Sequence, residues 1–120
     1  MYVVLADDQV DVRRALTFVL EHECDLQLAS EACNADELLH WLSGICPDLV
    51  LLDWELPGGG RELIRRMREI HRGVKIIALS VRPEARDEAL SAGVQGFVSK
   101  GDPPERLLGV VHSLRSDAPI

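Results

Sequence analysis

The stretch DLVLLDWELPG, residues 48–58, decides the fold of this chain. Leu49 to Leu52 is a short apolar run that ends on Asp53, and Pro57 and Gly58 belong to a loop a few residues later. An apolar run of this length, bounded by turn signals, is typical of a strand buried on both faces of a sheet. It is the most apolar run in the chain, so we expect this strand to be central.

Three further apolar runs share this design, because each leads into a polar residue. They are Val3–Ala6 before Asp7 and Asp8, Val74–Leu79 before Ser80, and Gly96–Ser99 before Lys100. A fifth strand is expected at Leu26–Ser30, although Gln27 interrupts its apolar pattern. In an open parallel sheet, ligands bind just outside the carboxyl ends of the strands. We therefore expect these distant polar residues to meet at one edge.

Helical patterns alternate with the five runs. Apolar residues at helical spacing predict a helix over residues 9–22, and Asn34 with Glu37 forms a capping-box pattern before the next helix, which Gly44 would cap. The remaining helices are expected from the loop at residues 57–60 to Gly73, from Pro83 to Ala92, and from Pro103-Pro104 onward. This alternation predicts an α/β fold: a flavodoxin-like (βα)5, doubly wound, five-stranded parallel sheet in a three-layer sandwich. We expect residues 1–120 to form a single domain, with 116–120 as a tail or the start of a linker.

Charge and cysteine content indicate which classes of partner and which cellular compartment to expect. The chain has 13 basic and 20 acidic residues, a net charge of −7 and a pI near 5.0, which disfavours direct nucleic-acid binding. Three cysteines without a CxxC pair indicate reduced, mostly buried thiols in a cytoplasmic protein. The N-terminus reads as a strand, not a signal peptide, and no apolar stretch is long enough to span a membrane.

The polar residues at the strand ends predict a specific chemistry. Three carboxylates, a hydroxyl and an amine in one crevice suit Mg²⁺ and a phosphoryl group, since Mg²⁺ prefers oxygen ligands. The order of these residues, with LADD, LLDWELPG, ALS and FVSKGDPPERLL, resembles the receiver domain of two-component response regulators over essentially the whole chain. The last motif is most similar to receivers of regulators with a C-terminal helix-turn-helix (LuxR-type) output domain.

The resemblance implies a role for each site residue. Asp53 would accept a phosphoryl group from a histidine kinase or phosphotransfer protein, with Lys100 and Ser80 contacting that group. Mg²⁺ would be bound directly by Asp8 and Asp53, through water by Asp7, and by the backbone carbonyl of Glu55. Ser80 and Phe97 would act as the switch, although many receivers carry Tyr at the position of Phe97.

The resemblance also implies an output surface. The face that responds would comprise residues 83–92, 95–100 and 104–114, controlling transcription through an attached or partner domain. A homodimer through the first and last helices, or the fourth and last, stays open. The domain would modify itself, with autophosphatase activity at most, and would not be an enzyme acting on an external substrate. Two alternatives remain: a degenerate receiver that only binds protein, and an aspartyl-phosphate phosphatase, which typically needs a second aspartate where Glu55 stands.

Two features depart from the usual pattern. The loop PGGG, residues 57–60, is one residue shorter than is common in the family, and its glycines leave the backbone permissive. Glu55 and Arg82 each lie two residues beyond a site residue, at positions that flank the site entrance in the family that the chain resembles. We hypothesise that they form a partly exposed ion pair that hinders attacking water and slows dephosphorylation.

Overall fold

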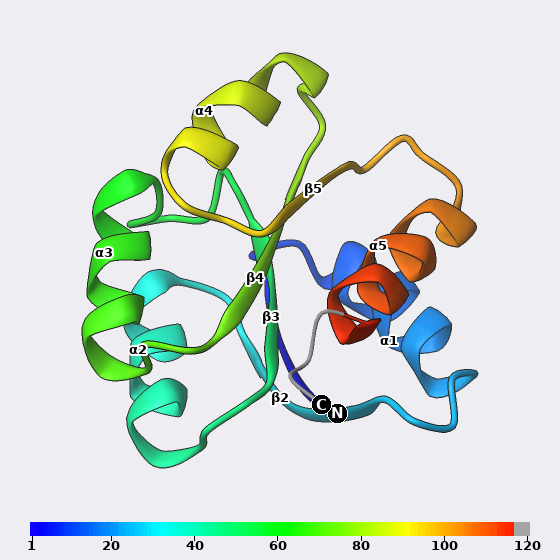
Figure 1. Ribbon diagram of the computed structural model, residues 1–120, viewed down its shortest axis with the longest axis horizontal. Coiled ribbons are helices and arrows are strands. Elements are labelled where there is room, and N and C mark those ends of the chain that lie inside the picture. The colour runs from blue at the N-terminus through cyan, green and yellow to red at the C-terminus, as the bar shows by residue number, and fades with distance from the viewer. Residues whose placement is uncertain (117–120) are drawn as a thin grey trace.

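The computed structural model describes residues 1–116, which form three layers with the sheet in the middle (Figure 1). All strands are parallel, in the order β2-β1-β3-β4-β5. The strands are β1 Tyr2–Ala6, β2 Gln27–Ala32, β3 Leu49–Asp53, β4 Lys75–Ser80 and β5 Gly96–Ser99. The helices are α1 Val10–Glu21, α2 Ala35–Gly44, α3 Arg61–Ile70, α4 Arg86–Ser91 and α5 Pro104–Ser116, with a 3₁₀ turn at Pro83–Ala85. The predicted fold is confirmed.

Most element boundaries match the prediction, and the differences have local causes. β2 begins at Gln27 and extends to Ala32, and its pairing with β1 shifts register between Val3 and Val4. Gly44 is the last residue of α2 and does not cap it, so that prediction is wrong. The cap is Ile45, whose extended backbone leaves the helix without a left-handed turn. The capping box is confirmed, since Asn34 accepts a hydrogen bond from the amide of Glu37 at 2.9 Å.

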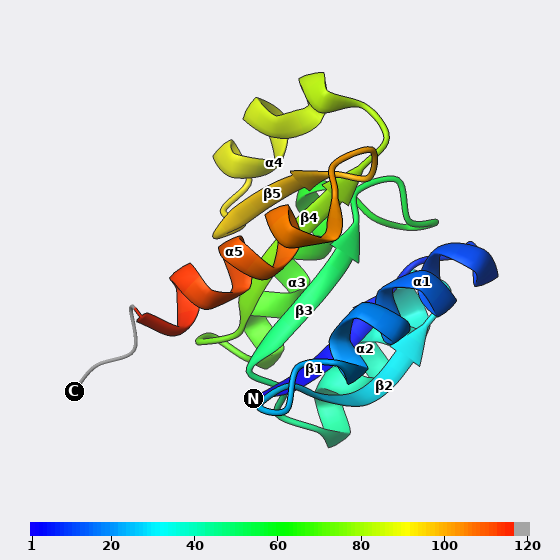
Figure 2. The ribbon, with the colours of Figure 1, turned by 90° about the vertical axis from the view of Figure 1, so that its right-hand side faces the viewer.

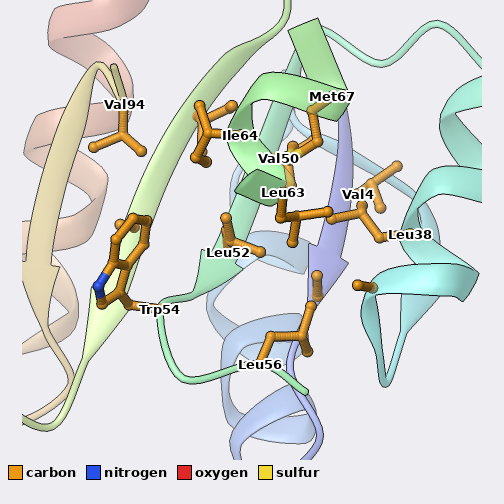
Figure 3. Close-up of a cluster of buried hydrophobic side chains, with 14 of the residues drawn as sticks. Val4, Leu38, Val50, Leu52, Trp54, Leu56, Leu63, Ile64, Met67 and Val94 are labelled. Carbon is orange, nitrogen blue, oxygen red and sulfur yellow. The ribbon is translucent and has the colours of Figure 1, made fainter. Parts of the chain in front are cut away.

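The sheet divides the core in two because side chains alternate along each strand. On one side, Val4, Val50, Leu52 and their neighbours pack against α2, α3 and α4 (Figure 3). On the other side, the intervening strand residues, such as Val3, Leu5 and Leu51, pack against α1 and α5. Figures 1 and 2 show this layering, with β3 at the centre as predicted. A strand buried on both faces fixes the position of the residue that ends it, which is Asp53.

The glycine-rich loop after β3 is packed against the start of α2. The carbonyl of Pro57 accepts a hydrogen bond from the amide of Ala35 at 3.0 Å. Gly58 has φ of 80°, and a Cβ there would lie 2.9 Å from the Cβ of Ala35. Gly60 has φ of 95°. The loop therefore needs glycine at Gly58 both for its backbone angle and for the close approach of α2.

Two minor expectations have different outcomes. The cysteines are free, but the prediction that they are mostly buried is wrong: Cys24 and Cys46 are exposed and Cys33 is half-buried. The reason is their placement in turns and at element ends, outside the apolar stripes. The tail expected at residues 116–120 lies almost entirely outside the described residues. Within the described part of the chain, none of the helices combines the length and the apolar character needed to cross a membrane.

Candidate functional site

The same turn follows four of the strands at the carboxyl edge of the sheet. In each, a side-chain oxygen accepts a hydrogen bond from the amide two residues later. The pairs are Asp7 with Gln9 at 2.9 Å, Asp53 with Glu55 at 3.0 Å, Ser80 with Arg82 at 3.0 Å, and Ser99 with Gly101 at 3.3 Å. These turns hold the loops close to the strand ends, next to the residues predicted to form the site.

Asp7, Asp8 and Asp53 come together as predicted and, with Lys100, make up what we call the acidic pocket. One carboxylate oxygen from each acid lies within 4.8 Å of the others. Asp7 and Asp53 are buried, whereas Asp8 is exposed at the mouth. Asp7 accepts from Gln9, which is the N-cap residue of α1 and makes no side-chain cap of its own. Neither acid is therefore the N-cap residue of α1.

Lys100 neutralises part of this negative charge. Its Nζ lies 2.8 Å from Asp7 Oδ2 and 3.3 Å from Asp53 Oδ1, and its side chain is largely buried. Burial alone would lower the pKa of Lys100, but its close contact with the Asp7 carboxylate and the charges of Asp53 and Asp7 outweigh burial and raise the pKa. Lys100 is therefore a fixed cation between the two buried acids.

The carboxyl of Asp53 is harder to ionise than that of a free aspartate, because its pKa is raised. Burial raises the pKa of Asp53, and the charge of Asp7 raises it further, while the Glu55 amide and Lys100 act to lower it. The net direction is upward. A second cation in the pocket would relieve this cost.

The pocket fits a magnesium ion. Its donors are three carboxylates, the hard oxygen ligands that Mg²⁺ takes together with several waters. Asp7 Oδ2 is buried and, among the described residues, has the ion pair with Lys100 but no hydrogen bond of good geometry. An exposed acid at the mouth and two buried acids behind it match a hydrated cation that enters from solvent.

The other predicted residues form a second group, which we call the rim: Glu55, Ser80 and Arg82. Arg82 Nη2 lies 3.1 Å from Glu55 Oε2, so the predicted ion pair is present, and both side chains are partly exposed as expected. The Ser80 hydroxyl is fully buried and donates to the Glu55 carboxylate, at 2.8 Å from Oε1 and 3.0 Å from Oε2. Sequence reasoning paired Glu55 with Arg82 but did not predict the hydrogen bond between Ser80 and Glu55.

Two aromatic residues lie behind the site. Phe97 on β5 is buried and belongs to the core on the α2–α3–α4 side of the sheet. Trp54 follows Asp53 directly and is also buried in that core, with its backbone amide bonded to the Leu79 carbonyl at 2.7 Å (Figure 3). The buried position of Phe97 is what a core residue would show. Its predicted role in a switch stays a prediction.

Arg13 is a residue that sequence reasoning missed. Its Nη1 donates to the backbone carbonyl of Asp7 at 2.6 Å, and its Nε lies 3.4 Å from Glu31 on β2. Arg13 therefore ties the loop that carries the acids to the neighbouring strand. One signal in the sequence could have indicated this contact. Arg13 lies in the first turn of the helix that follows Asp7 and Asp8, so its side chain can reach back to the loop that carries them.

The arrangement has the parts that phosphoryl capture requires, in one place. A carboxylate at a rigid strand end is a nucleophile, a lysine is a partner for phosphoryl oxygens, and two more acids suit a divalent cation. The model of the response regulator receiver domain matches residues 3–112, which is most of the chain. The chain belongs to this family.

Curated relatives of this receiver domain support its assignment to the response regulator family. It is 32% identical over 117 residues to the response regulator UvrY of Escherichia coli K12, covering 95% of this chain and 54% of that protein. It is 34% identical over 115 residues to the transcriptional regulatory protein UhpA of Salmonella typhimurium LT2, covering 93% and 57%. The receiver domain spans little more than half the length of these relatives.

Solved structures show the same fold. The crystal structure of a LuxR-family two-component response regulator from Aurantimonas sp. SI85-9A1 superposes with a TM-score of 0.87 at 27% identity, covering 96% of this chain and 84% of that one. The LuxR-type lineage expected from the SKGDPPERLL stretch is therefore confirmed.

Proposed function

We propose that this receiver domain accepts a phosphoryl group on Asp53, in a reaction that depends on Mg²⁺. The observation that carries the proposal is the acidic pocket: a nucleophilic carboxylate at a rigid strand end, a lysine 3.3 Å away, and two further acids around it. Asp7, Asp8, Asp53 and the backbone carbonyl of Glu55 would hold the metal. When bound, Mg²⁺ would neutralise charge on the phosphoryl oxygens.

The chain's own residues supply the rest of the reaction. An oxygen of Asp53 attacks phosphorus and forms the acyl-phosphate bond, while the bond from phosphorus to the donor breaks and its electron pair leaves with the donor. Lys100, already charged, moves its ion pair from the Asp53 carboxylate to a phosphoryl oxygen. The Ser80 hydroxyl donates a hydrogen bond to another phosphoryl oxygen. Because Asp53 is buried at a strand end, attack occurs from one fixed direction.

The donor and the output are further proposals. A histidine kinase or phosphotransfer protein would supply the phosphoryl group, and residues 83–92, 95–100 and 104–114, including Phe97, would respond to it. Control of transcription would pass through a domain beyond these residues, as the name of the transcriptional regulatory protein UhpA suggests. We propose a cytoplasmic location, no direct contact with nucleic acid or membrane, and no turnover of an external substrate. A homodimer through α5 with α1 or α4 stays open.

The ion pair between Glu55 and Arg82 would slow loss of the phosphoryl group. The pair stands at the entrance, where it would impede a water molecule approaching phosphorus in line with the acyl-phosphate bond. The phosphatase alternative receives no support, because Glu55 is engaged by Ser80 and Arg82 and not poised as a free acid. The degenerate-receiver alternative is not favoured either, because Asp7, Asp8, Asp53, Ser80 and Lys100 are all present, and the three acids lie together with Lys100.

Intact-protein mass spectrometry tests the proposal. The protein is incubated with acetyl phosphate, with Mg²⁺ or with a chelator, beside Asp53→Asn. We expect one phosphoryl group to be gained only by the unaltered protein with Mg²⁺. If well-folded protein gains no phosphoryl group, acceptance from a small donor is contradicted. The experiment is then repeated with a phosphorylated histidine kinase, and no gain from that donor would contradict the proposal as a whole.

A further inference from the structure

The Ser80 hydroxyl is already engaged in the unmodified protein. It carries a single proton, and the Glu55 carboxylate accepts it at 2.8 Å and 3.0 Å. Its own oxygen accepts the Arg82 amide at 3.0 Å. Among the described residues these are its hydrogen-bond partners, and neither is Asp53. The Ser80 hydroxyl proton, which would be donated to the phosphoryl group, is therefore already donated to Glu55.

Glu55 touches both halves of the site. Its backbone amide donates to Asp53 Oδ1 at 3.0 Å, while its side chain accepts from Ser80 and pairs with Arg82. A change at Asp53 therefore acts on the residue that holds the hydroxyl. Glu55 is a positioning residue that links the phosphoacceptor, through its amide, to the Ser80 hydroxyl, through its carboxylate.

We propose that the Glu55 carboxylate is an autoinhibitory latch, which holds the Ser80 hydroxyl and competes with the phosphoryl group for its proton. This rests on the proposed function, because it needs a phosphoryl group on Asp53. In the latched state the Ser80 rotamer is fixed toward the rim. In the released state the hydroxyl turns to the phosphoryl group, and Glu55 keeps Arg82.

The latch can open because its release leaves Glu55 solvated. The side chains of Glu55 and Arg82 are 36% and 47% exposed, so water replaces the lost bond to Ser80. The hydroxyl, by contrast, is fully buried and needs an acceptor in either state. A hydrogen bond to a charged group is worth enough to shift a two-state equilibrium by about tenfold or more.

The test is a double-mutant cycle on capture of beryllofluoride, a mimic of the phosphoryl group, in the presence of Mg²⁺. Glu55→Ala, Ser80→Ala and the double variant are compared with the unaltered protein by backbone amide NMR titration. Arg82→Ala keeps the latch and removes only its exposed partner. Glu84→Ala removes a nearby acid that does not bond Ser80. Coupling constants give the Ser80 χ1 rotamer in the absence of the mimic.

The latch predicts a single Ser80 rotamer in the unaltered protein and an averaged one in Glu55→Ala. It also predicts that Glu55→Ala binds beryllofluoride about tenfold more tightly, and that this gain largely disappears when Ser80 is already alanine. Arg82→Ala and Glu84→Ala should keep the single rotamer.

Three results would overturn the latch: an averaged rotamer in the unaltered protein, equal affinity in Glu55→Ala, or an equal gain in the Ser80→Ala background. The last result would mean that Glu55 acts only through charge repulsion of the anionic mimic. If no variant binds beryllofluoride, the proposed function fails, and with it the competition. The rotamer measurement would still show whether Glu55 holds the hydroxyl, so the two failures are distinguishable.

Discussion

The acidic pocket and the rim lie at the same edge of the sheet, but they differ in what holds them in place. The pocket is built on the ends of β1, β3 and β5, and Lys100 is only 12% exposed. The rim is built on loop residues around Ser80, and Arg82 is 47% exposed. Charges in the pocket are screened little by water, while those on the rim are screened strongly. The pocket is therefore suited to chemistry, and the rim to adjustable control of that chemistry.

Removing Lys100 should produce the largest effect. Lys100→Met is expected to slow phosphoryl uptake from acetyl phosphate by about 100-fold or more, since a buried charged donor to a developing anion has that scale of effect. The rate is measured by mass spectrometry over time. Lys75→Met is the matched control. Lys75 is the one other lysine in the chain, and it begins β4, the strand that ends at Ser80 near the site. A similar loss in Lys75→Met would mean that damage to the fold, and not the pocket, explains the result.

Metal binding should be the next most sensitive property. Asp8→Asn is expected to weaken Mg²⁺ binding by about tenfold or more, since one of three carboxylates is lost. Trp54, next to Asp53 in the chain, provides a fluorescence signal for the titration. Asp11→Asn alters an exposed acid in the first turn of α1 and should leave the affinity nearly unchanged. Equal affinities for Asp8→Asn and the unaltered protein would exclude Asp8 as a ligand.

The stability of the pocket should depend on pH in a definite direction. Burial, and then Asp7, raise the pKa of Asp53 in the folded protein, so folding favours the protonated carboxyl. Stability should therefore fall as pH rises through the unfolded and then the folded pKa. Without Mg²⁺, Asp53→Asn is expected to raise the free energy of unfolding by on the order of 1 kcal/mol at neutral pH.

Urea unfolding at several pH values checks this expectation. Below about pH 3 the gain should vanish, because the carboxyl is then protonated in both states. Asp87→Asn, at a side chain that is 94% exposed, should show no comparable gain. An Asp53→Asn protein that is less stable than the unaltered one at neutral pH would contradict an upward shift in the pKa of Asp53.

The rim should show the smallest effect on stability. Arg82→Ala is expected to change the free energy of unfolding by no more than about 1 kcal/mol, because the ion pair is exposed. Its effect should instead appear as a several-fold shorter lifetime of the phosphorylated protein, followed by mass spectrometry after the donor is removed. Arg86→Ala, in a separate exposed pair, is the control. An unchanged lifetime in both Arg82→Ala and Glu55→Ala would refute the role of the pair in slowing dephosphorylation.

The same contrast explains what the sequence could predict. The pocket follows from the chain because an apolar run fixes each strand, and the strand fixes the residue that ends it, as with Leu49–Asp53. The entrance pair of Glu55 and Arg82 was also predicted, because these two positions flank the site entrance in the family that the chain resembles. The bond from Ser80 to Glu55 was not, because it depends on which rotamers two neighbouring loops allow. Arg13 was missed for the same reason, since its partners are a backbone carbonyl and an acid on another strand.

Identification of the phosphorylated residue tests the central claim most directly. Protein treated with acetyl phosphate and Mg²⁺ is reduced with borohydride, which converts an aspartyl phosphate to homoserine, and its peptides are sequenced by tandem mass spectrometry. The account predicts homoserine at position 53 and at neither Asp7 nor Asp8. Homoserine at Asp7 or Asp8, or a phosphoryl group that resists reduction because it lies on another type of side chain, would contradict it.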